Sequence, residues 1–533
     1  MKASDELFNL IKSLTKTEKR YFTLFASLQK GSKTFIKLFN AIDEQTRSGK
    51  EGKEYDEGSI KKKFQGEKFI KQLTFTKIYL TNLILKSLRN FHSSNSAINK
   101  ANHLLLNIGI LYNKELLDLC LKQITTLKKI TEKHELYVQY FEALSWEENV
   151  MNKQQFITQD INAVEKMISE KNNVLAKVNN INHYNSLVTR WWYSSHKKIT
   201  NRDASDRAYY QAIEIDSLLK NKQQAITRKS KLAFYLLKSF LHKRNGNMNQ
   251  TIAYRTKLLD YMEQFTDNII TWPKMYIAAI FNLAGDFFDM GKHKQALSIL
   301  KKSDRLKKIK LDDAARRFLY EANINFKTDF YNNTGEFDKT ISLISEFESG
   351  INEFKQYDNS SLYFIAVHNI ACAYMGVTDF KNALKWINKI LNSKVPVVED
   401  IHCFARIINL VIHFEMGNEE HLEYITRSTY RYLYKRKRLY KVESCIIDFM
   451  RKTERLNSQK EFMSAFKKLQ EELIRLSSDP FESRAFEYFD FISWLESKIE
   501  NRPFAEIVKQ KARMNDTRPN DSSVGREVGQ AKT

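Results

Sequence analysis

Proline and glycine are scarce in this chain of 533 residues, which contains 5 prolines and 15 glycines. Because both residues interrupt helices, long stretches of the chain contain no helix breaker. Leu, Ile, Phe, Lys and Glu recur three and four positions apart almost throughout, as is typical of amphipathic helices. The sequence therefore predicts an all-α protein, and its 42% hydrophobic content is enough to bury several cores.

Cysteine and long apolar runs are scarce as well. The four cysteines, Cys120, Cys372, Cys403 and Cys445, lie far apart and form no CxxC pair, so the sequence indicates neither a disulfide framework nor a zinc knuckle. The N-terminus carries Asp5 where a signal peptide would be cationic, and no stretch reaches the ~18 apolar residues of a membrane span. We expect neither export nor membrane insertion, and a cytoplasmic location fits the cysteine content.

The common catalytic signatures are also missing. The sequence has no GxxxxGK[ST] phosphate loop, no GxGxxG after a strand, no HExxH and no GxSxG. His368 and Cys372 stand four positions apart on a predicted helix, but two ligands do not complete a metal site and the sequence identifies no third. We therefore expect a non-catalytic protein without cofactor or metal, in which His368 and Cys372 line the inner surface of a helical unit.

The first 95 residues are predicted to form a helical unit of their own. Thr15 and Glu18 have the T-x-x-E spacing of a capping box, which marks the start of a helix. The polar run 44–59 holds three glycines and few apolar groups, so we expect an exposed loop there. Apolar periodicity over 60–91 predicts a long helix with a possible break near its start.

Residues 96–478 are predicted to form an array of helix pairs. Amphipathic periodicity covers 104–128 and 135–150, and each stretch predicts one helix. The Asn-rich run at 171–186 is polar and is expected to contain a connection between helices.

The C-terminal part is predicted to end the array. Residues 479–511 are strongly aromatic and are expected to form capping helices. Residues 512–533 are polar, contain Gly and Ser, and lack periodicity, so we expect a disordered tail. The aromatic and aliphatic positions after Pro480 are Phe481, Phe486, Phe489, Phe491, Ile492 and Trp494.

A short motif indicates how the helices pair. In residues 282–300, NLAGDFFDMGKHKQALSIL, a helix ends at a lone glycine and a second helix starts at once. Gly291 can adopt a left-handed conformation at little cost, so the chain can reverse within a few residues. Ala296 then lies where the two helix axes approach most closely, and a larger side chain would overpack the contact. The remaining motif positions place a bulky, a Leu, a small and an aromatic residue on the first helix and a bulky residue on the second: Ile280, Leu283, Ala284, Phe287 and Leu300.

This pattern resembles the tetratricopeptide repeat over roughly residues 278–392. A second copy has Thr378 in place of the turn glycine, and a weaker copy surrounds Gly335. Around Gly246 and Gly417 only the turn and the general periodicity remain. The turn positions from 291 to 417 are 44, 43 and 39 residues apart, whereas the family repeats every ~34 residues, so longer helices or loops are implied.

The resemblance implies a right-handed α-solenoid of antiparallel helix pairs with a concave groove that binds a peptide or a protein helix. The groove contacts would come from the first helix of each pair. They would form an apolar pocket flanked by polar groups, contributed by Phe281, Phe288, Asn325, Asp329, Asn332, His368, Cys372 and Met375.

Basic residues suggest an alternative function. The chain has 86 Lys and Arg against 63 Asp and Glu, a formal net charge of +23, which favours acidic partners. The run 430–441, YRYLYKRKRLYK, has six cations and four tyrosines, and on a helix Arg431, Lys435 and Arg438 would share a face able to contact phosphates. The same run also fits a solvated helix face with Leu433 buried beneath it.

These observations predict a cytoplasmic scaffold, adaptor or regulator that binds a peptide or protein partner, an acidic one included, in a concave groove. The alternative is a regulator associated with nucleic acid through basic helical faces. An enzyme ranks third. The sequence identifies neither the partner nor the oligomeric state.

Overall fold

The all-α prediction is confirmed by the computed structural model of the chain, in which every regular element of the described residues is a helix. By its internal packing the chain divides into two compact units, Met1–Asn179 and Asn180–Thr533. None of the described helices combines the length and the apolar character needed to cross a bilayer. The structure describes residues 3–516 except for 30–33, 48–54, 94–95, 157–159, 198–209, 355–359, 394, 396, 398 and 480. Most of the predicted tail, 517–533, therefore lies outside the described residues.

Five helices at the start of the first unit share one apolar core. The capping box of Thr15 and Glu18 is present at the start of the second helix, as predicted. Gly66, at φ +91°, separates the fourth helix from a short 3-10 helix, Lys68–Gln72, so the break expected near the start of the 60–91 stretch lies at Gly66. The helices are α1 (Ala3–Ser13), α2 (Lys16–Ser27), α3 (Thr34–Arg47), α4 (Glu57–Lys63) and α5 (Leu73–Phe91). Their core contains Ile11, Phe22, Leu38, Ile42 and Leu80.

The predicted loop at 44–59 is shorter than expected. Helix α3 continues to Arg47, and α4 begins at Glu57 after the N-cap Asp56, whose side chain accepts a hydrogen bond from the Ser59 backbone N–H. The remaining part, 48–54, lies outside the described residues.

The next helices correct two predictions. The stretch 104–128 is not one helix, because α6 (Ala97–Asn113) and α7 (Leu117–Lys133) meet there at a turn in which Glu115 has φ +61°. The Asn-rich run expected to hold a connection lies inside the long helix α9 (Ile161–Lys197). Between them, α8 (Tyr137–Lys153) packs against α6 and α7 around a core that includes Ile108, Ile124 and Ala143.

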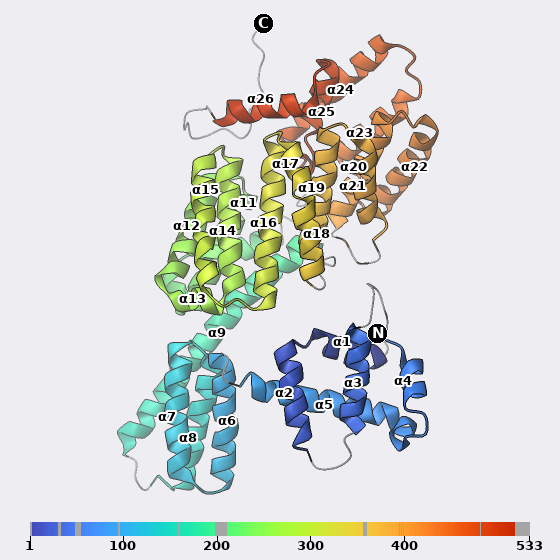
Figure 1. Cartoon of the computed structure of the whole chain (residues 1–533). Helices are drawn as coiled ribbons and strands as arrows, with labels where there is room; N and C mark the ends of the chain where they lie inside the picture. The colour runs from blue at the N-terminus through green and yellow to red at the C-terminus, as the bar shows by residue number, and fades with distance from the viewer. Residues whose placement is uncertain are drawn as a thin grey trace. The chain divides into compact units, whose positions relative to one another are not determined.

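The second unit contains a series of helices joined by short turns. The first helices of successive pairs pack against one another, α14 on α16, α16 on α19 and α19 on α21, and Figure 1 shows α14, α16 and α19 side by side. The pairs are α11 (Arg228–Arg244) with α12 (Met248–Gln264), α14 (Pro273–Asp289) with α15 (His293–Leu300), α16 (Asp313–Asn333) with α17 (Phe337–Ser342), α19 (Ser361–Gly376) with α20 (Phe380–Leu391), and α21 (Glu399–Glu415) with α22 (Glu419–Lys435). The short helices α13 (Thr266–Thr271) and α18 (Ile344–Glu353) follow α12 and α17.

The turns within these five pairs share one backbone conformation. Each has one residue with φ between +61° and +73°: Gly246, Gly291, Gly335, Thr378 and Gly417. Ala296 and Ala383, one turn into the second helix of their pairs, are completely buried. The predicted combination of a left-handed turn and a small residue at the close contact is therefore present in the structure.

The C-terminal segment (residues 481–516) packs back onto these pairs. Helices α23 (Lys441–Thr453) and α24 (Gln459–Ser477) lead to a 3-10 helix, Ser483–Glu487, and then to α25 (Phe491–Ile499) and α26 (Phe504–Asp516). Phe489, Phe491, Trp494 and Phe504 belong to the same apolar core as α19 and α21. This segment is part of the folded core of the second unit.

Candidate functional site

The candidate site is the face formed by the first helices of the pairs, which we call the first-helix face. Two adjacent residues of the C-terminal segment connect its parts. The Glu487 carboxylate acts electrostatically on Asp329 of α16, and Tyr488 contacts α19 and α21. The charges of Asp289 on α14 and of Lys243 on α11 also act on the Asp329 carboxylate.

The α19–α21 half of this face is covered by the chain itself. The Tyr488 ring stacks on Phe404 of α21, with 4.2 Å between centroids, and lies edge-on to His368 of α19 at 6.1 Å. The Cys372 Sγ lies 3.8 Å from the Tyr488 carbonyl oxygen. His368, Cys372 and Met375 are buried. The expectation that these three residues line an open groove is corrected, because the C-terminal segment occupies that position.

His368 and Cys372 behave as core residues. Burial lowers the pKa of His368 to about 4 and raises the pKa of the Cys372 thiol to about 12, so both are uncharged at neutral pH. Their Nδ1 and Sγ atoms lie 3.7 Å apart. Among the described residues no group of three potential metal ligands surrounds them or any other position. The pair therefore contributes packing to this face.

Polar anchors hold the C-terminal segment against the pairs. Glu415, at the end of α21, accepts hydrogen bonds from Trp494 Nε1 at 2.6 Å and from Lys498 Nζ at 2.5 Å. The Phe504 ring stacks on Phe337 of α17 at 5.5 Å. A Cβ at Gly335 would lie 2.8 Å from the Ala505 carbonyl oxygen, so α26 approaches the α16–α17 turn closely.

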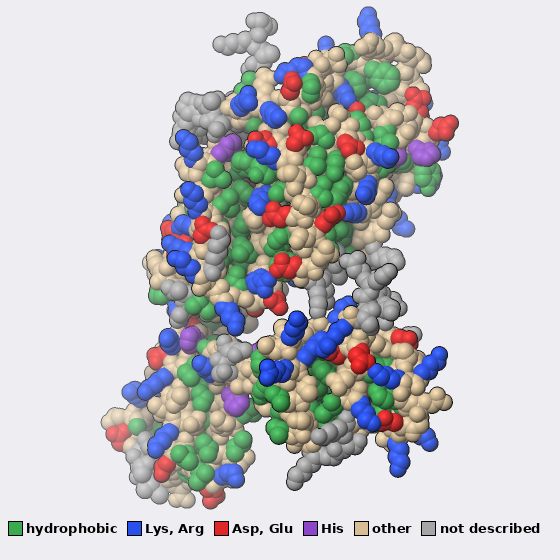
Figure 2. Space-filling model, in the orientation of Figure 1, with side chains coloured by type: hydrophobic (Ala, Val, Ile, Leu, Met, Phe, Trp, Pro, Cys, Tyr) green, Lys and Arg blue, Asp and Glu red, His purple; other side chains and the backbone are tan. Residues whose placement is uncertain are grey.

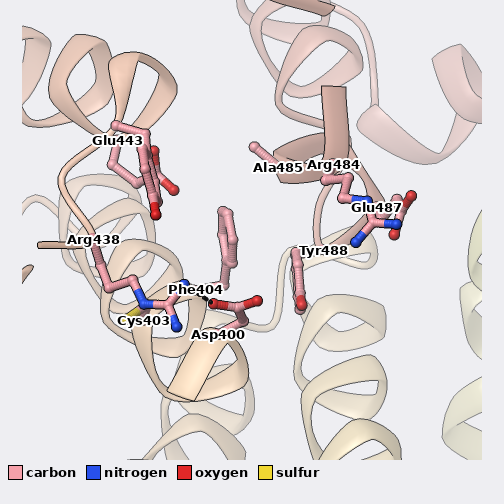
Figure 3. Close-up of a pocket in the computed structure, with 10 residues that line it drawn as sticks. Asp400, Cys403, Phe404, Arg438, Glu443, Arg484, Ala485, Glu487 and Tyr488 are labelled. Carbon is pink, nitrogen blue, oxygen red and sulfur yellow. Dashed lines mark ion pairs between the residues drawn. The ribbon is translucent and has the colours of Figure 1, made fainter. Parts of the chain in front are cut away.

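A small cavity of about 40 Å³, lined by both charged and apolar side chains, remains where the segment meets α21. In Figure 3 the Arg438 guanidinium points at Asp400, while Arg484 and Glu487 of the C-terminal segment lie together on the opposite wall. Arg438 is 3.4 Å from Asp400 and 3.0 Å from Glu399. A cavity of this size holds a few waters at most, so we assign it no ligand.

Four of the predicted groove residues connect neighbouring pairs. Asn325 Nδ2 donates to the Leu362 carbonyl oxygen at 3.0 Å, and Asn332 Nδ2 donates to the Asn369 carbonyl oxygen at 2.7 Å, so both amides tie α16 to α19.

The two predicted aromatic groove residues also lie between helices. Phe281 and Phe288 of α14 pack on Phe326 and Phe330 of α16, with centroids 6.2 Å and 4.9 Å apart. The two amides and the two rings thus connect neighbouring helices, and their predicted contact with a partner stays a prediction.

Asp329 is the predicted groove residue that remains open to solvent. Protein surrounds its carboxylate on several sides, and this partial desolvation, together with repulsion by Asp289 and Glu487, raises its pKa to about 6. Asn333, one turn further along α16, is also exposed and donates to an Asp329 carboxylate oxygen at 3.0 Å. The α14–α16 half of the first-helix face is therefore accessible and acidic.

The predicted basic face of the run 430–441 is only partly present. Arg431 and Lys435 are exposed on α22, but the helix ends at Lys435 and Lys437 has φ +55°. Arg438 consequently points inward and is 7% exposed. Figure 2 shows Lys and Arg side chains distributed among Asp and Glu over the visible surface. The prediction that Arg431, Lys435 and Arg438 share one face is corrected.

Sequence reasoning missed the covering of the first-helix face by residues 481–504. The dense aromatic pattern of this stretch predicted a cap, and a cap was expected at the end of the array. Periodicity says which face of a helix is apolar. It does not say which distant helix covers that face.

No protein-family model, no curated protein and no solved structure gives a significant match to this chain. The resemblance of residues 278–392 to the tetratricopeptide repeat consequently stays a prediction.

Proposed function

We propose that the chain is a non-catalytic helical-repeat protein, a right-handed α-solenoid similar to tetratricopeptide proteins, that binds a polypeptide partner on its first-helix face in the cytoplasm. The observation that carries this proposal is the packing of residues 481–504 on the α19–α21 half of that face. A face that binds one segment of its own chain has the apolar pockets and hydrogen-bonding groups that polypeptide binding requires.

The open half of the face favours a positively charged segment as the partner. The charges of Asp289 and Glu487 repel the Asp329 carboxylate there, with Lys243 as the opposing charge. Desolvation is the main cause of the raised Asp329 pKa and repulsion adds to it, so a cationic side chain that approached Asp329 would favour the charged carboxylate. The net charge of +23 suggested an acidic partner, but the local charges at the site determine its chemistry, and they are mostly negative.

Site-specific photocrosslinking tests this proposal. A photoreactive amino acid at Asn333, beside Asp329, is expected to capture a partner in native lysate, and the captured peptides should be rich in Lys and Arg. The matched control carries the same group at Asn388, an exposed asparagine on the second helix α20. Equal capture at both positions, or capture of acidic peptides only, would contradict the proposal.

The affinity for a defined peptide tests the proposal quantitatively. A fluorescent Lys-rich peptide is expected to bind the wild-type chain more tightly as the pH rises from 5 to 7, because Asp329 with its pKa of about 6 becomes charged in that window. Asp329→Asn should weaken binding at pH 7 by about tenfold, or ~1.4 kcal/mol, and remove the pH dependence. Binding that is unaffected by this substitution would exclude Asp329 from the site.

A further inference from the structure

The outer side of α5, in the first unit, carries large apolar side chains that remain in water. Helix α5 packs against α1, α2 and α3, and Figure 1 shows it crossing α2 and α3. Leu73, Leu80 and Ile84 on its inner side are buried. On the outer side, Phe75 is 74% exposed and Ile78 is 56% exposed. Large apolar side chains that stay exposed together on one face mark an interaction surface.

The spacing of the exposed side chains fits a second helix. Five exposed positions follow one another at alternating intervals of three and four residues, and we call them the α5 seam: Phe75, Ile78, Asn82, Leu85 and Arg89. Two helices pack along a seam with this spacing, and the α5 seam extends for roughly 20 Å. Asn82 and Arg89 lie within the line, where a facing helix can offer them hydrogen-bond partners. The apolar interior of a membrane offers them none, so insertion of the seam into a bilayer would be costly.

The charges along α5 are positive. The helix contains no Asp and no Glu, and its exposed cations, Lys86 and Arg89, form no ion pair within the part of the chain that the structure describes. Glu57, a carboxylate that reaches α5 from α4, is already paired with the buried Lys77 at 2.5 Å. A second copy of α5 would bring cations against cations. Charge complementarity therefore selects a helix whose flanking positions are acidic.

We propose that the α5 seam binds an acidic amphipathic helix of a protein partner. The apolar side chains of that helix pack on Phe75, Ile78 and Leu85, and its flanking carboxylates pair with Lys86 and Arg89. Removal of the apolar side chains from water supplies affinity, while the charge pairs select the partner. The seam belongs to the first unit, whereas the acidic first-helix face belongs to the second. The two surfaces therefore take partners of opposite charge.

Fluorescence anisotropy of two labelled peptides with the full chain tests this surface. Both peptides are amphipathic helices with Leu along one face, and the positions flanking that face are Glu in one and Gln in the other. The Glu peptide is expected to bind about tenfold more tightly than the Gln peptide at low salt, and added salt should reduce the difference. Phe75→Ser and Arg89→Glu should each weaken binding of the Glu peptide by about tenfold. The matched controls are Tyr424→Ser and Arg431→Glu, at exposed positions of α22, where Tyr424 is 76% exposed.

Thermal unfolding separates a loss of binding from a loss of structure. Phe75→Ser should unfold at the wild-type temperature, because the ring that it removes is exposed. The proposal is overturned if the Glu peptide binds no more tightly than the Gln peptide, or if Phe75→Ser binds the Glu peptide as well as Tyr424→Ser does. Two results in place of peptide binding would also overturn it. Dimers that Phe75→Ser dissociates in sedimentation would identify a second copy as the occupant, and Phe75-dependent binding to phosphatidylserine vesicles would identify a membrane surface.

Discussion

Both halves of the first-helix face are built from the same kind of helix pair, but one half is covered by protein and the other is exposed to solvent. Over α19 and α21, the Tyr488 ring packs on Phe404 and His368, and His368 is uncharged and buried. Over α14 and α16, Asp329 remains in water with its pKa raised to about 6. The difference arises from the C-terminal segment, in which Tyr488 covers the α19–α21 half while Glu487 acts on Asp329 only through its charge.

The same kind of helix pair therefore supports a covered surface at α19 and α21 and an uncovered one at Asp329. Apolar residues such as Phe491 are completely buried, and their removal from water contributes to folding. On the acidic half, Asp289 and Glu487 repel the exposed Asp329 carboxylate. A surface that the protein keeps open at an electrostatic cost is a candidate for binding.

Truncating the cover should have the largest effect. Phe491→Ala removes a completely buried ring of the C-terminal segment from the core that it shares with α19 and α21 and is expected to lower the free energy of unfolding by about 3–5 kcal/mol. Urea unfolding followed by circular dichroism measures the change. Tyr434→Ala is the control, because Tyr434 is an aromatic residue with 66% of its surface exposed. A loss below ~1 kcal/mol in Phe491→Ala would show that the cover is not part of the core.

Lowering the pH should have the second-largest effect, because it destabilises the covered half of the face. The folded-state pKa of His368, about 4, lies below its ordinary value of 6.5, so the unfolded chain binds the proton first as the pH falls. The stabilisation by the neutral ring is complete above pH ~6.5 and is lost between 6.5 and 4, by roughly 3 kcal/mol.

The difference in unfolding free energy between wild type and His368→Leu should therefore shrink or reverse as the pH falls through that window. Asp329 acts in the opposite direction, because its folded pKa is raised and the protonated form favours the folded state. Asp329→Asn is thus the internal comparison. A wild-type and His368→Leu pair with parallel pH profiles would contradict a buried neutral imidazole.

Substitutions at two glycines distinguish the contribution of α26 docking to stability from the cost of backbone strain in the turns. Gly335 and Gly417 both have positive φ, +72° and +66°, so alanine costs about 1–2 kcal/mol at either position. A Cβ at Gly417 meets nothing within 4 Å, whereas at Gly335 it would lie 2.8 Å from the Ala505 carbonyl oxygen. Gly335→Ala is therefore expected to cost more than Gly417→Ala and, unlike it, to expose α26 to limited proteolysis. Equal losses and equal cleavage would contradict the docking.

The sequence predicted the turns of the second unit well because their signal is local. A lone glycine followed by a buried alanine, as at Gly291 and Ala296, specifies both the reversal and the close contact. In the first unit the corresponding turn positions are Glu115 and Glu135, with φ +61° and +52°, and no glycine marks them. Both precede a leucine, in KEL and HEL, and this repeated pair was the signal available for separating α6 from α7.

The site was less predictable, because its state depends on contacts between residues distant in sequence. His368 and Cys372 were correctly placed on a first helix, but Tyr488, more than a hundred positions away, decides that they are buried. Arg438 was placed on a helix face because the cationic run is continuous. The helix ends three residues earlier, so the guanidinium turns toward Glu399 and Asp400 instead.

The smallest predicted effect concerns the one pair of the array that lacks a turn glycine. Thr378 has φ +61° at the position where the four other pairs have glycine, and a β-branched residue is disfavoured in that conformation. Thr378→Gly relieves this strain but increases the conformational entropy of the unfolded chain, so we expect a net gain of about 0.5–1 kcal/mol in unfolding free energy. The gain should be absent for Thr429→Gly, a buried threonine inside α22, which is expected to lose stability. Thr378 lies in the turn between α19 and α20, the pair that contributes to the covered half of the face. A gain in unfolding free energy for Thr378→Gly would show that this turn has the same left-handed geometry as the turn at Gly335, in the pair that bears Asp329.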